Sequence, residues 1–235
     1  MASDPVTAED IAILIPCYNV GSRVVAVAEG ALRQTSKVIV VDDGCTDGCI
    51  APLHDLPVEI LSFPKNRGKG HALLAGFRFA LKKPDVAGVC VVDADGQHDT
   101  NEFPRLYKAF QEQDADLVIG SRVFTDAHVP FRSRFGNQVT ALVTALLLRR
   151  RLPDTQSGYR LLSRSFAQTV VDTIAGGRYE TEMEIIVNAV RGGHRIVSVP
   201  IATLYEEGNR SSHFNKVGDS LRIYGRLFRA VTRRR

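Results

Sequence analysis

Short apolar runs rich in valine and isoleucine alternate with helix-like stretches along the first half of the chain. This alternation limits what the chain can fold into. Strands are expected at residues 11–15 (ended by Pro16), 38–41, 58–61, 86–92 and 117–119, and helices at about 23–34, 68–83 and 101–113. Apolar strands that alternate with helices predict an α/β fold with a mostly parallel sheet and helices on both faces. No repeat or low-complexity linker interrupts the 235 residues, so a single domain over residues 1–235 is expected.

Polar side chains follow three of the expected strands at the point where each apolar run ends. Tyr18 and Asn19 follow the first strand, Asp42 and Asp43 the second, and Asp93-Ala94-Asp95 the fourth. Open α/β sheets bind ligands at the carboxyl ends of their strands, so these groups are expected at one edge. Two carboxylates one residue apart can hold a hard divalent cation and leave positions open for phosphate oxygens. Solvated carboxylates in turns are the alternative for any one of these positions.

The cysteines do not have the spacing of a metal site. Three residues separate Cys45 from Cys49, and Cys17 and Cys90 form no second pair that would complete a zinc site. All four are therefore expected to be reduced thiols in a cytoplasmic protein. No run of about 20 apolar residues is present to form a membrane-spanning helix. The polar, acidic residues 1–10 do not have the pattern of a signal peptide.

The net charge of +4 comes from the end of the chain, where residues 216–235 hold seven basic residues and one acidic residue. A helix over about residues 216–235 would be amphipathic. Its apolar side would carry Val217, Leu221, Tyr224, Phe228 and Val231, and its opposite side Arg222, Arg226, Arg229 and Arg233. Such a helix is expected either to pack on the protein body or to lie on anionic lipid. Nucleic acid is not expected as a partner, because no recognition module accompanies the basic tail.

Seven short motifs occur in order between about Ile13 and Phe214. They are Pro16-Cys17-Tyr18-Asn19, Val41-Asp42-Asp43-Gly44, Asn66-Arg67-Gly68-Lys69-Gly70, Asp93-Ala94-Asp95-Gly96-Gln97-His98, Gly120-Ser121-Arg122, Gln156-Ser157-Gly158-Tyr159-Arg160 and Val199-Pro200-Ile201. This set resembles glycosyltransferase family 2, with the GT-A fold, and within it the polyprenol-phosphate mannosyl- and glucosyltransferases of the dolichol-phosphate-mannose synthase group. The resemblance implies a Rossmann-like, mostly parallel sheet with helices on both faces.

The resemblance also implies a donor site for a nucleotide sugar of the GDP-mannose or UDP-glucose type. The residues it assigns to this site are Pro16, Tyr18, Asn19, Asp42 and Lys69. It assigns Mg²⁺ or Mn²⁺ to Asp93, Asp95 and Gln97, where the cation would offset charge on the leaving nucleoside diphosphate. A helix start with flexible glycines is the alternative reading of Gly68-Lys69-Gly70.

For the acceptor, the resemblance implies a lipid phosphate held by basic and polar side chains. These are Arg122, Arg132, Ser133, Arg134 and His213, of which Arg122 joins Asp93 and Asp95 as a catalytic residue. A phosphate acceptor is already anionic near pH 7 and needs cations rather than a base. A hydroxyl acceptor would need a base, and Asp154 keeps that alternative open. Cys45 and His213 depart from the family's pattern, which commonly has Ser and a more strongly basic residue.

The activity implied is metal-dependent, inverting transfer of a hexose from a nucleotide sugar to a polyprenyl phosphate. The protein would work at the cytoplasmic face of the membrane, as a peripheral protein or with a membrane-protein partner. Two alternatives remain open: transfer to a hydroxyl of a glycan or lipid, and a module that binds nucleotide sugar without turnover. The chain has no Trp, so the Gln-x-x-Arg-Trp motif of processive polysaccharide synthases is absent.

Overall fold

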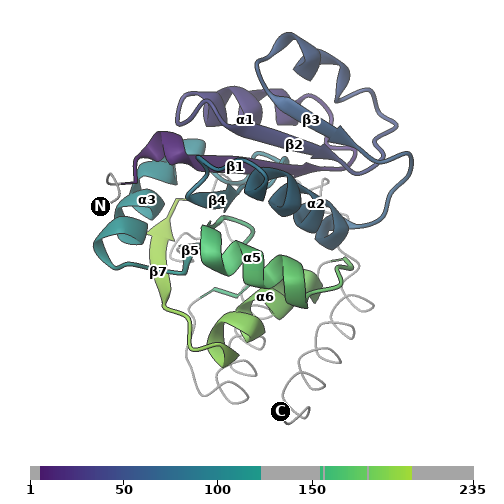
Figure 1. Cartoon of the computed structure of the whole chain (residues 1–235). Helices are drawn as coiled ribbons and strands as arrows, with labels where there is room; N and C mark the ends of the chain where they lie inside the picture. Colours follow the sequence, from purple (N-terminus) through teal and green to yellow (C-terminus); the bar gives the residue numbers. More distant parts are fainter. Residues whose placement is uncertain (1–5, 123–153, 156, 179, 203–235) are drawn as a thin grey trace, which may run out of the picture.

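The structure is a computed structural model that describes residues 6–122, 154–155, 157–178 and 180–202. A seven-stranded sheet with the order β3-β2-β1-β4-β6-β5-β7 forms its centre (Figure 1). The strands are β1 Ile11–Cys17, β2 Val38–Asp42, β3 Glu59–Ser62, β4 Gly88–Val91, β5 Leu117–Arg122, β6 Arg160–Ser163 and β7 Ile196–Ile201. Neighbouring strands are parallel except at β6, which is antiparallel to both β4 and β5. The expected α/β fold with a mostly parallel sheet is confirmed.

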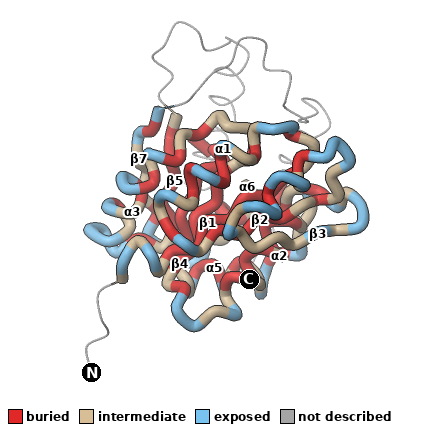
Figure 2. The backbone as a smooth tube through the Cα atoms, turned by 90° about the horizontal axis from the view of Figure 1, so that it is seen from above, coloured by how far each residue is buried: buried red, intermediate tan, exposed pale blue. Residues whose placement is uncertain are grey.

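Helices cover both faces of the sheet, as expected. They are α1 Arg23–Leu32, α2 Lys69–Leu81, α3 Phe103–Glu112, α5 Arg164–Thr173 and α6 Glu180–Arg191, with short 3-10 turns η1 Ala8–Asp10, η2 Ala51–Asp55 and η3 Thr100–Glu102. Side chains alternate between the two faces along each strand. Ile13 and Ile15 therefore share a core with α1 and α3, whereas Ala12 and Leu14 share a core with α2, α5 and α6. Figure 2 shows the central strands buried and the outer turns exposed.

The first strand extends further than expected. β1 continues through Pro16 to Cys17, so the prediction that the proline ends the strand is wrong by two residues. The Leu14 carbonyl points toward β4, where it accepts the N–H of Val92. Pro16 lies two residues after Leu14 in the same strand, so its nitrogen also points toward β4. The β1–β4 pairing has already ended there, at Leu14 and Val91. The missing N–H of a proline therefore costs no ladder hydrogen bond.

The antiparallel strand β6 shapes the carboxyl edge of the sheet. Because β6 runs opposite to β4, its first residue, Arg160, pairs with the last residue of β4, Val91. The segment that leads into β6 is thereby brought beside the loop that leaves β4. This neighbourhood holds most of the charged side chains considered below.

Two further expectations concern the chain as a whole. No helix within the described ranges has both the length and the apolar character needed to cross a membrane. The helix expected at about residues 216–235 lies outside the described residues. A single domain over residues 1–235 with that helix at its end stays a prediction.

Candidate active site

Asp93 lies two residues beyond the end of β4 and is held by a lysine. Lys69, the first residue of α2, places Nζ 2.6 Å from Asp93 Oδ1 and 3.0 Å from Oε1 of Glu182 in α6. Burial alone would raise the pKa of Asp93, but the positive charges of Lys69 and Arg160 outweigh it and hold that pKa below its usual range. Lys69 thus joins three segments of the chain at the carboxyl edge.

Asp95 follows in the same loop, in a different electrostatic setting. Its Oδ1 accepts the backbone N–H of Gln97 at 3.0 Å. Burial and the neighbouring Asp93 carboxylate raise the pKa of Asp95. Two half-buried carboxylates that repel each other form a donor set that a bound divalent cation would stabilise. The oxygen donors of Asp93, Asp95 and Gln97 therefore fit Mg²⁺ or Mn²⁺.

Gly158 packs directly against Asp93. A Cβ atom built on Gly158 would lie 2.1 Å from Asp93 Oδ2 and 2.5 Å from its Cγ, closer than real Cβ atoms approach other heavy atoms. Only glycine therefore lets the segment before β6 lie beside the Asp93 carboxylate in this position. This contact gives the Ser157-Gly158 part of the sequence motif a physical role, to make room for Asp93.

Arg160 fixes that segment. Its side chain is almost fully buried and donates to the carbonyls of Thr155 at 3.0 Å, Ser157 at 2.8 Å and Glu182 at 2.6 Å. One guanidinium thereby satisfies three backbone acceptors on two segments. One segment is the stretch of chain that precedes β6, and the other is helix α6. The loop beside Asp93 is tied to the helix that supplies Glu182.

Arg122 and Asp154 form the second ion pair of the edge. Arg122, the last residue of β5, donates Nε to Asp154 Oδ2 at 2.7 Å and Nη2 to Oδ1 at 3.1 Å. The Asp154 side chain is fully buried, and that of Arg122 is 18% exposed. The structure therefore joins the residue predicted to bind the acceptor phosphate to the residue considered as an alternative base. The sequence patterns did not predict this pairing.

His98 lies close to both ion pairs, since the charges of Asp93 and Asp154 and of Lys69 and Arg122 all act on it. Its ring is buried, and its centroid lies 5.6 Å from that of the Tyr159 ring. Within the described residues, His98 Nδ1 has no hydrogen-bond partner. Burial lowers the pKa of His98 to about 4, so the imidazole is neutral near pH 7.

The predicted donor residues lie where β1 and β2 end. Asp42 Oδ1 accepts the N–H of Cys45 at 2.7 Å, which orients the carboxylate at the end of β2. Asn19, with a positive φ of 49°, accepts the N–H of Thr46 at 2.8 Å through Oδ1. The loops after β1 and β2 are thus connected side by side. Tyr18 is half-buried there, and Pro16 is buried in β1.

Asp43 has a structural role beside Asp42. It is buried and accepts from the Asn66 side chain and from the N–H groups of Arg67 and Gly68, at 2.7 to 2.8 Å. Gly68 then packs against Gly177 and Arg178, which precede α6, and a Cβ on Gly70 would lie 2.0 Å from Oγ1 of Thr181 in the first turn of α6. This packing accounts for both glycines as parts of a helix start and leaves Lys69 as the charged group of the motif.

Some predicted site residues lie outside the described residues, namely Arg132, Ser133, Arg134 and His213. Sequence reasoning in turn missed Glu182. It lies 113 residues from its partner Lys69, and no spacing rule connects the two. The acidic start of the α6 sequence is the only local signal that points to it.

Comparison with known proteins identifies the family. Residues 12–171 match the model described as Glycosyl transferase family 2. The chain belongs to glycosyltransferase family 2. The resemblance seen in the motifs is confirmed, and the protein is a glycosyltransferase.

Two relatives of this glycosyltransferase are named for lipid phosphates. It is 31% identical over 207 residues to the undecaprenyl-phosphate mannosyltransferase of Micrococcus luteus, and the match covers 83% of each chain. It is 26% identical over 219 residues to a UDP-N-acetylglucosamine–dolichyl-phosphate N-acetylglucosaminyltransferase of Methanococcus voltae, covering 84% of this chain and 86% of the relative.

A solved structure supports the fold. The glucosyl-3-phosphoglycerate synthase of Mycobacterium tuberculosis, crystallised with Mn²⁺, uridine diphosphate and phosphoglyceric acid, aligns with a TM-score of 0.75 at 17% identity. The alignment covers 94% of this chain and 78% of the synthase. At this identity the likeness establishes the GT-A fold alone.

Proposed function

We propose that this glycosyltransferase moves a hexose from a nucleotide sugar, of the GDP-mannose or UDP-glucose type, to a polyprenyl phosphate. The observation that carries the proposal is the arrangement of charge at the carboxyl edge. The Asp93 carboxylate, two residues before Asp95, is paired with Lys69, and the Arg122 guanidinium is paired with Asp154. Two relatives whose names include undecaprenyl phosphate and dolichyl phosphate support this acceptor class.

On the donor side, Asp93, Asp95 and Gln97 would hold Mg²⁺ or Mn²⁺ against the diphosphate. A bound cation stabilises the charge that grows on the leaving nucleoside diphosphate. Lys69, fixed between Asp93 and Glu182, adds a positive charge to the same region. Asp42, oriented by the Cys45 N–H, would accept a hydrogen bond from the base, and Pro16, Tyr18 and Asn19 would line the nucleoside pocket.

On the acceptor side, the available chemistry favours phosphate over a hydroxyl. Arg122 presents a planar guanidinium, which matches phosphate oxygens bidentately. Asp154, the candidate base, already accepts from Arg122 through both carboxylate oxygens. A carboxylate bound to a guanidinium is a weaker proton acceptor than a free one. A phosphate monoester needs no deprotonation at pH 7, so its attack does not depend on a base.

The proposed step is one displacement. An oxygen of the acceptor phosphate attacks the anomeric carbon, and the bond from that carbon to the nucleoside diphosphate breaks on the opposite face. A single displacement inverts the configuration at the anomeric carbon. Arg132, Ser133, Arg134 and His213 complete the proposed acceptor site on the basis of their motifs alone. We place the reaction at the cytoplasmic face of the membrane, where a polyprenyl phosphate would be met.

The test compares two acceptors that differ only in the phosphate. The purified protein is given a panel of nucleotide sugars with Mn²⁺, together with either a polyprenyl phosphate or the matching free polyprenol. We expect nucleoside diphosphate and glycosyl lipid to form with the phosphate and neither to form with the alcohol. Equal rates with both acceptors would favour the hydroxyl-directed alternative, and Asp154→Asn would then be the first base variant to examine.

A further inference from the structure

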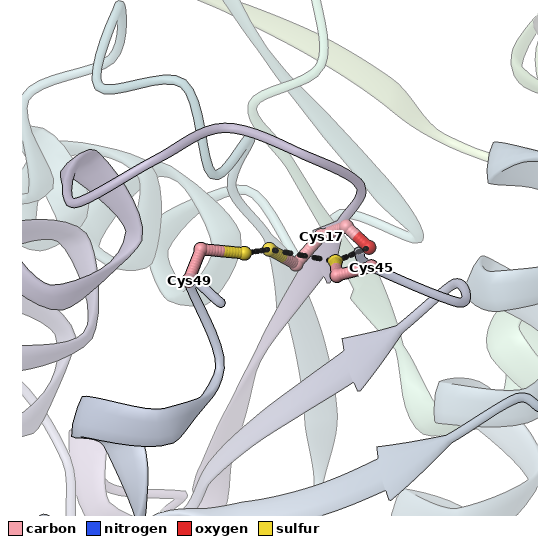
Figure 3. A group of neighbouring side chains, drawn as sticks. All are labelled: Cys17, Cys45 and Cys49. Atoms are coloured by element: carbon pink, nitrogen blue, oxygen red, sulfur yellow. Dashed lines mark hydrogen bonds between the residues drawn. The ribbon is translucent and has the colours of Figure 1, made fainter. Parts of the chain in front are cut away.

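Three cysteines from two strand ends meet near the proposed donor site, and we call them the thiol cluster: Cys17, Cys45 and Cys49 (Figure 3). Cys17 is the last residue of β1, and the other two lie in the loop that follows β2. The three sulfur atoms all lie within 4.8 Å of one another. All three are free thiols, as expected. The sequence spacing of the cysteines did not indicate a metal site, because the third thiol, Cys17, comes from β1 and is distant in sequence from the other two.

The spacing of the sulfur atoms is that of ligands around one cation. Cys17 Sγ lies 3.7 Å from Cys49 Sγ and 3.9 Å from Cys45 Sγ. A cation bound at about 2.3 Å from each thiolate holds its sulfur ligands about 3.8 Å apart in tetrahedral geometry and about 4.0 Å apart in trigonal geometry. The thiol cluster therefore needs only small side-chain adjustments to bind one cation with all three sulfurs.

Backbone hydrogen bonds fix the segments that carry the thiols. The N–H of Cys45 donates to Asp42 Oδ1 at 2.7 Å, and the N–H of Cys49 donates to Asp47 Oδ1 at 3.1 Å. Asn19 donates its N–H to Cys45 Sγ at 3.4 Å. An N–H directed at sulfur stabilises the thiolate form, and such outer hydrogen bonds orient metal ligands. Cys17 and Cys49 are buried while Cys45 is partly exposed, so a cation would enter past Cys45.

We propose that the thiol cluster binds one soft, thiophilic cation of the Zn²⁺ or Cu⁺ type. Each thiol releases its proton to solvent as its sulfur binds the cation. Sulfur ligands select soft ions, whereas the oxygen donors of Asp93 and Asp95 select hard ones, so the two sites take different metals. With three protein ligands, the site either leaves a fourth position to water, as suits Zn²⁺, or stays trigonal, as suits Cu⁺.

The position of the cluster gives the cation a consequence for the donor site. Cys45 is hydrogen-bonded through its N–H to Asp42 and through its sulfur to Asn19, two of the proposed donor residues. A cation that draws Cys45 Sγ toward Cys17 and Cys49 acts on both contacts. Linkage makes this effect reciprocal. If the bound cation changes the affinity for nucleotide by some factor, bound nucleotide changes the affinity for the cation by the same factor.

The test uses Cd²⁺ as the probe, because Cd²⁺ bound to thiolates absorbs in the ultraviolet and Cd²⁺ bound to carboxylates does not. The full chain, reduced and treated with chelator, is titrated with Cd²⁺ without oxygen and with excess Mg²⁺ to occupy oxygen sites. We expect an absorption that saturates at one Cd²⁺ per chain. Zn²⁺ and Cu⁺ are then added as competitors in separate arms, and the extent to which each displaces Cd²⁺ gives its relative affinity for the thiol cluster.

Two variants make the test specific. Cys45→Ser keeps the size of the side chain at a partly exposed position, and we expect it to weaken Cd²⁺ binding by about 100-fold or more. Cys90→Ala, at a buried thiol of β4 outside the cluster, is the matched control and should bind Cd²⁺ like the wild type. Thermal unfolding establishes that each variant is folded, and Cys49→Ser provides a second ligand variant.

Three results would overturn the proposal. The first is no saturable absorption in the folded wild type, which would mean that the thiols only pack together. The second is equal Cd²⁺ affinity in the wild type and in folded Cys45→Ser. The third is a reduced wild-type chain that fails to bind Cd²⁺ and that loses two hydrogens in mass when it is exposed to peroxide. That outcome would assign the cluster to disulfide chemistry instead.

Discussion

At the scale of single residues, two carboxylates in one loop have unequal settings. Lys69 and Arg160 hold the pKa of Asp93 down against its burial, whereas burial and the Asp93 charge raise that of Asp95. Asp93 is therefore already compensated by the protein's own cations. Asp95 lacks comparable compensation within the described residues, and its carboxylate stands to gain more from a bound cation.

Asp95→Ala tests that difference. Asp95 accepts a loop hydrogen bond from the Gln97 N–H, so we expect the free energy of unfolding to change by about 1 kcal/mol or less. Transfer should fall by at least about 100- to 1,000-fold, the usual effect of losing one electrostatic stabiliser of a transition state. Mn²⁺ affinity measured by calorimetry should fall as well. Glu112→Ala, which removes an exposed carboxylate in α3, is the control; normal transfer by Asp95→Ala would rule out the metal assignment.

Gly158→Ala tests the close packing on Asp93. The new Cβ would collide with the Asp93 carboxylate at 2.1 Å, so either the carboxylate or the segment before β6 must shift. We expect Mn²⁺ affinity to fall by roughly 10- to 100-fold, as when groups that support metal ligands are disturbed. Calorimetry measures this without relying on turnover.

Gly193→Ala is the matched control for that substitution. Gly193 has a positive φ of 72° and open space around its Cα, so alanine there costs about 1 to 2 kcal/mol of backbone strain without a collision. It should lower the melting temperature and leave Mn²⁺ affinity unchanged. If both variants lost the same stability and both kept their Mn²⁺ affinity, the contact between Gly158 and Asp93 would have no role in the metal site.

At the scale of secondary-structure elements, the buried Arg160 and the half-buried Arg164 do similar work in different places. Arg160 connects the segment before β6 to α6 through three carbonyls. Arg164, at the start of α5, donates to the carbonyls of Leu81, the last residue of α2, and of Lys83 and Val86 beyond it, at 2.6 to 2.8 Å. The Arg160 contacts lie beside Asp93, and the Arg164 contacts connect α5 to the end of α2 that is distant from Lys69.

We expect substitutions of Arg160 and Arg164 to have similar effects on stability but different effects on activity. Arg160→Met and Arg164→Met each leave three carbonyls without their donor, and we expect each to destabilise the fold by about 3 kcal/mol. Arg160→Met should in addition lower transfer per folded molecule, because its loop positions Gly158. Arg164→Met should not. Urea unfolding and assays well below the melting temperature separate the two quantities; equal activity in both variants would argue against a positioning role for Arg160.

The elements also show why prediction from sequence succeeds in one half of the sheet. β1, β2 and β4 are built on continuous apolar runs bounded by turn residues, β3 is a short run that includes Glu59, and all four were predicted with ends within about two residues. β6 has only four residues and follows a glycine-containing motif, so its pattern carries no strand signal. Its insertion between β4 and β5, antiparallel to both, depends on contacts distant in sequence.

The candidate site divides in the same way. The positions of Asp42 and Asp93 follow from where strands end, which a local pattern can predict. The partners of those residues do not follow from any local pattern. Lys69 meets Glu182 across 113 residues, Arg122 meets Asp154 across 32, and Cys45 meets Cys17 across 28. Such pairs require the register of the sheet, and the register is known only once the strands are assembled.

At the scale of the whole molecule, the proposed lipid acceptor requires that the chain reach a membrane surface. The sequence of residues 216–235 predicts a helix with an apolar side opposite four arginines, although these residues lie outside the described part of the structure. Such a helix would bind anionic lipid reversibly, with each basic residue adding about 1 kcal/mol. Salt should weaken the binding, since the Debye length is roughly 10 Å at 0.1 M.

Replacement of Arg222, Arg226, Arg229 and Arg233 by Gln keeps helix propensity and removes the charge. We expect the affinity of this variant for anionic vesicles to fall by about three orders of magnitude, so that it no longer sediments with them. It should also lose transfer to membrane-embedded acceptor. It should still bind nucleotide sugar in solution, because these arginines are distant in sequence from Asp42 and Asp93. The matched variant with Lys at all four positions keeps the charge and should sediment like the wild type. If the wild type fails to sediment with anionic vesicles even at low salt, the helix is not a membrane anchor, and a membrane-protein partner must bring the enzyme to its lipid.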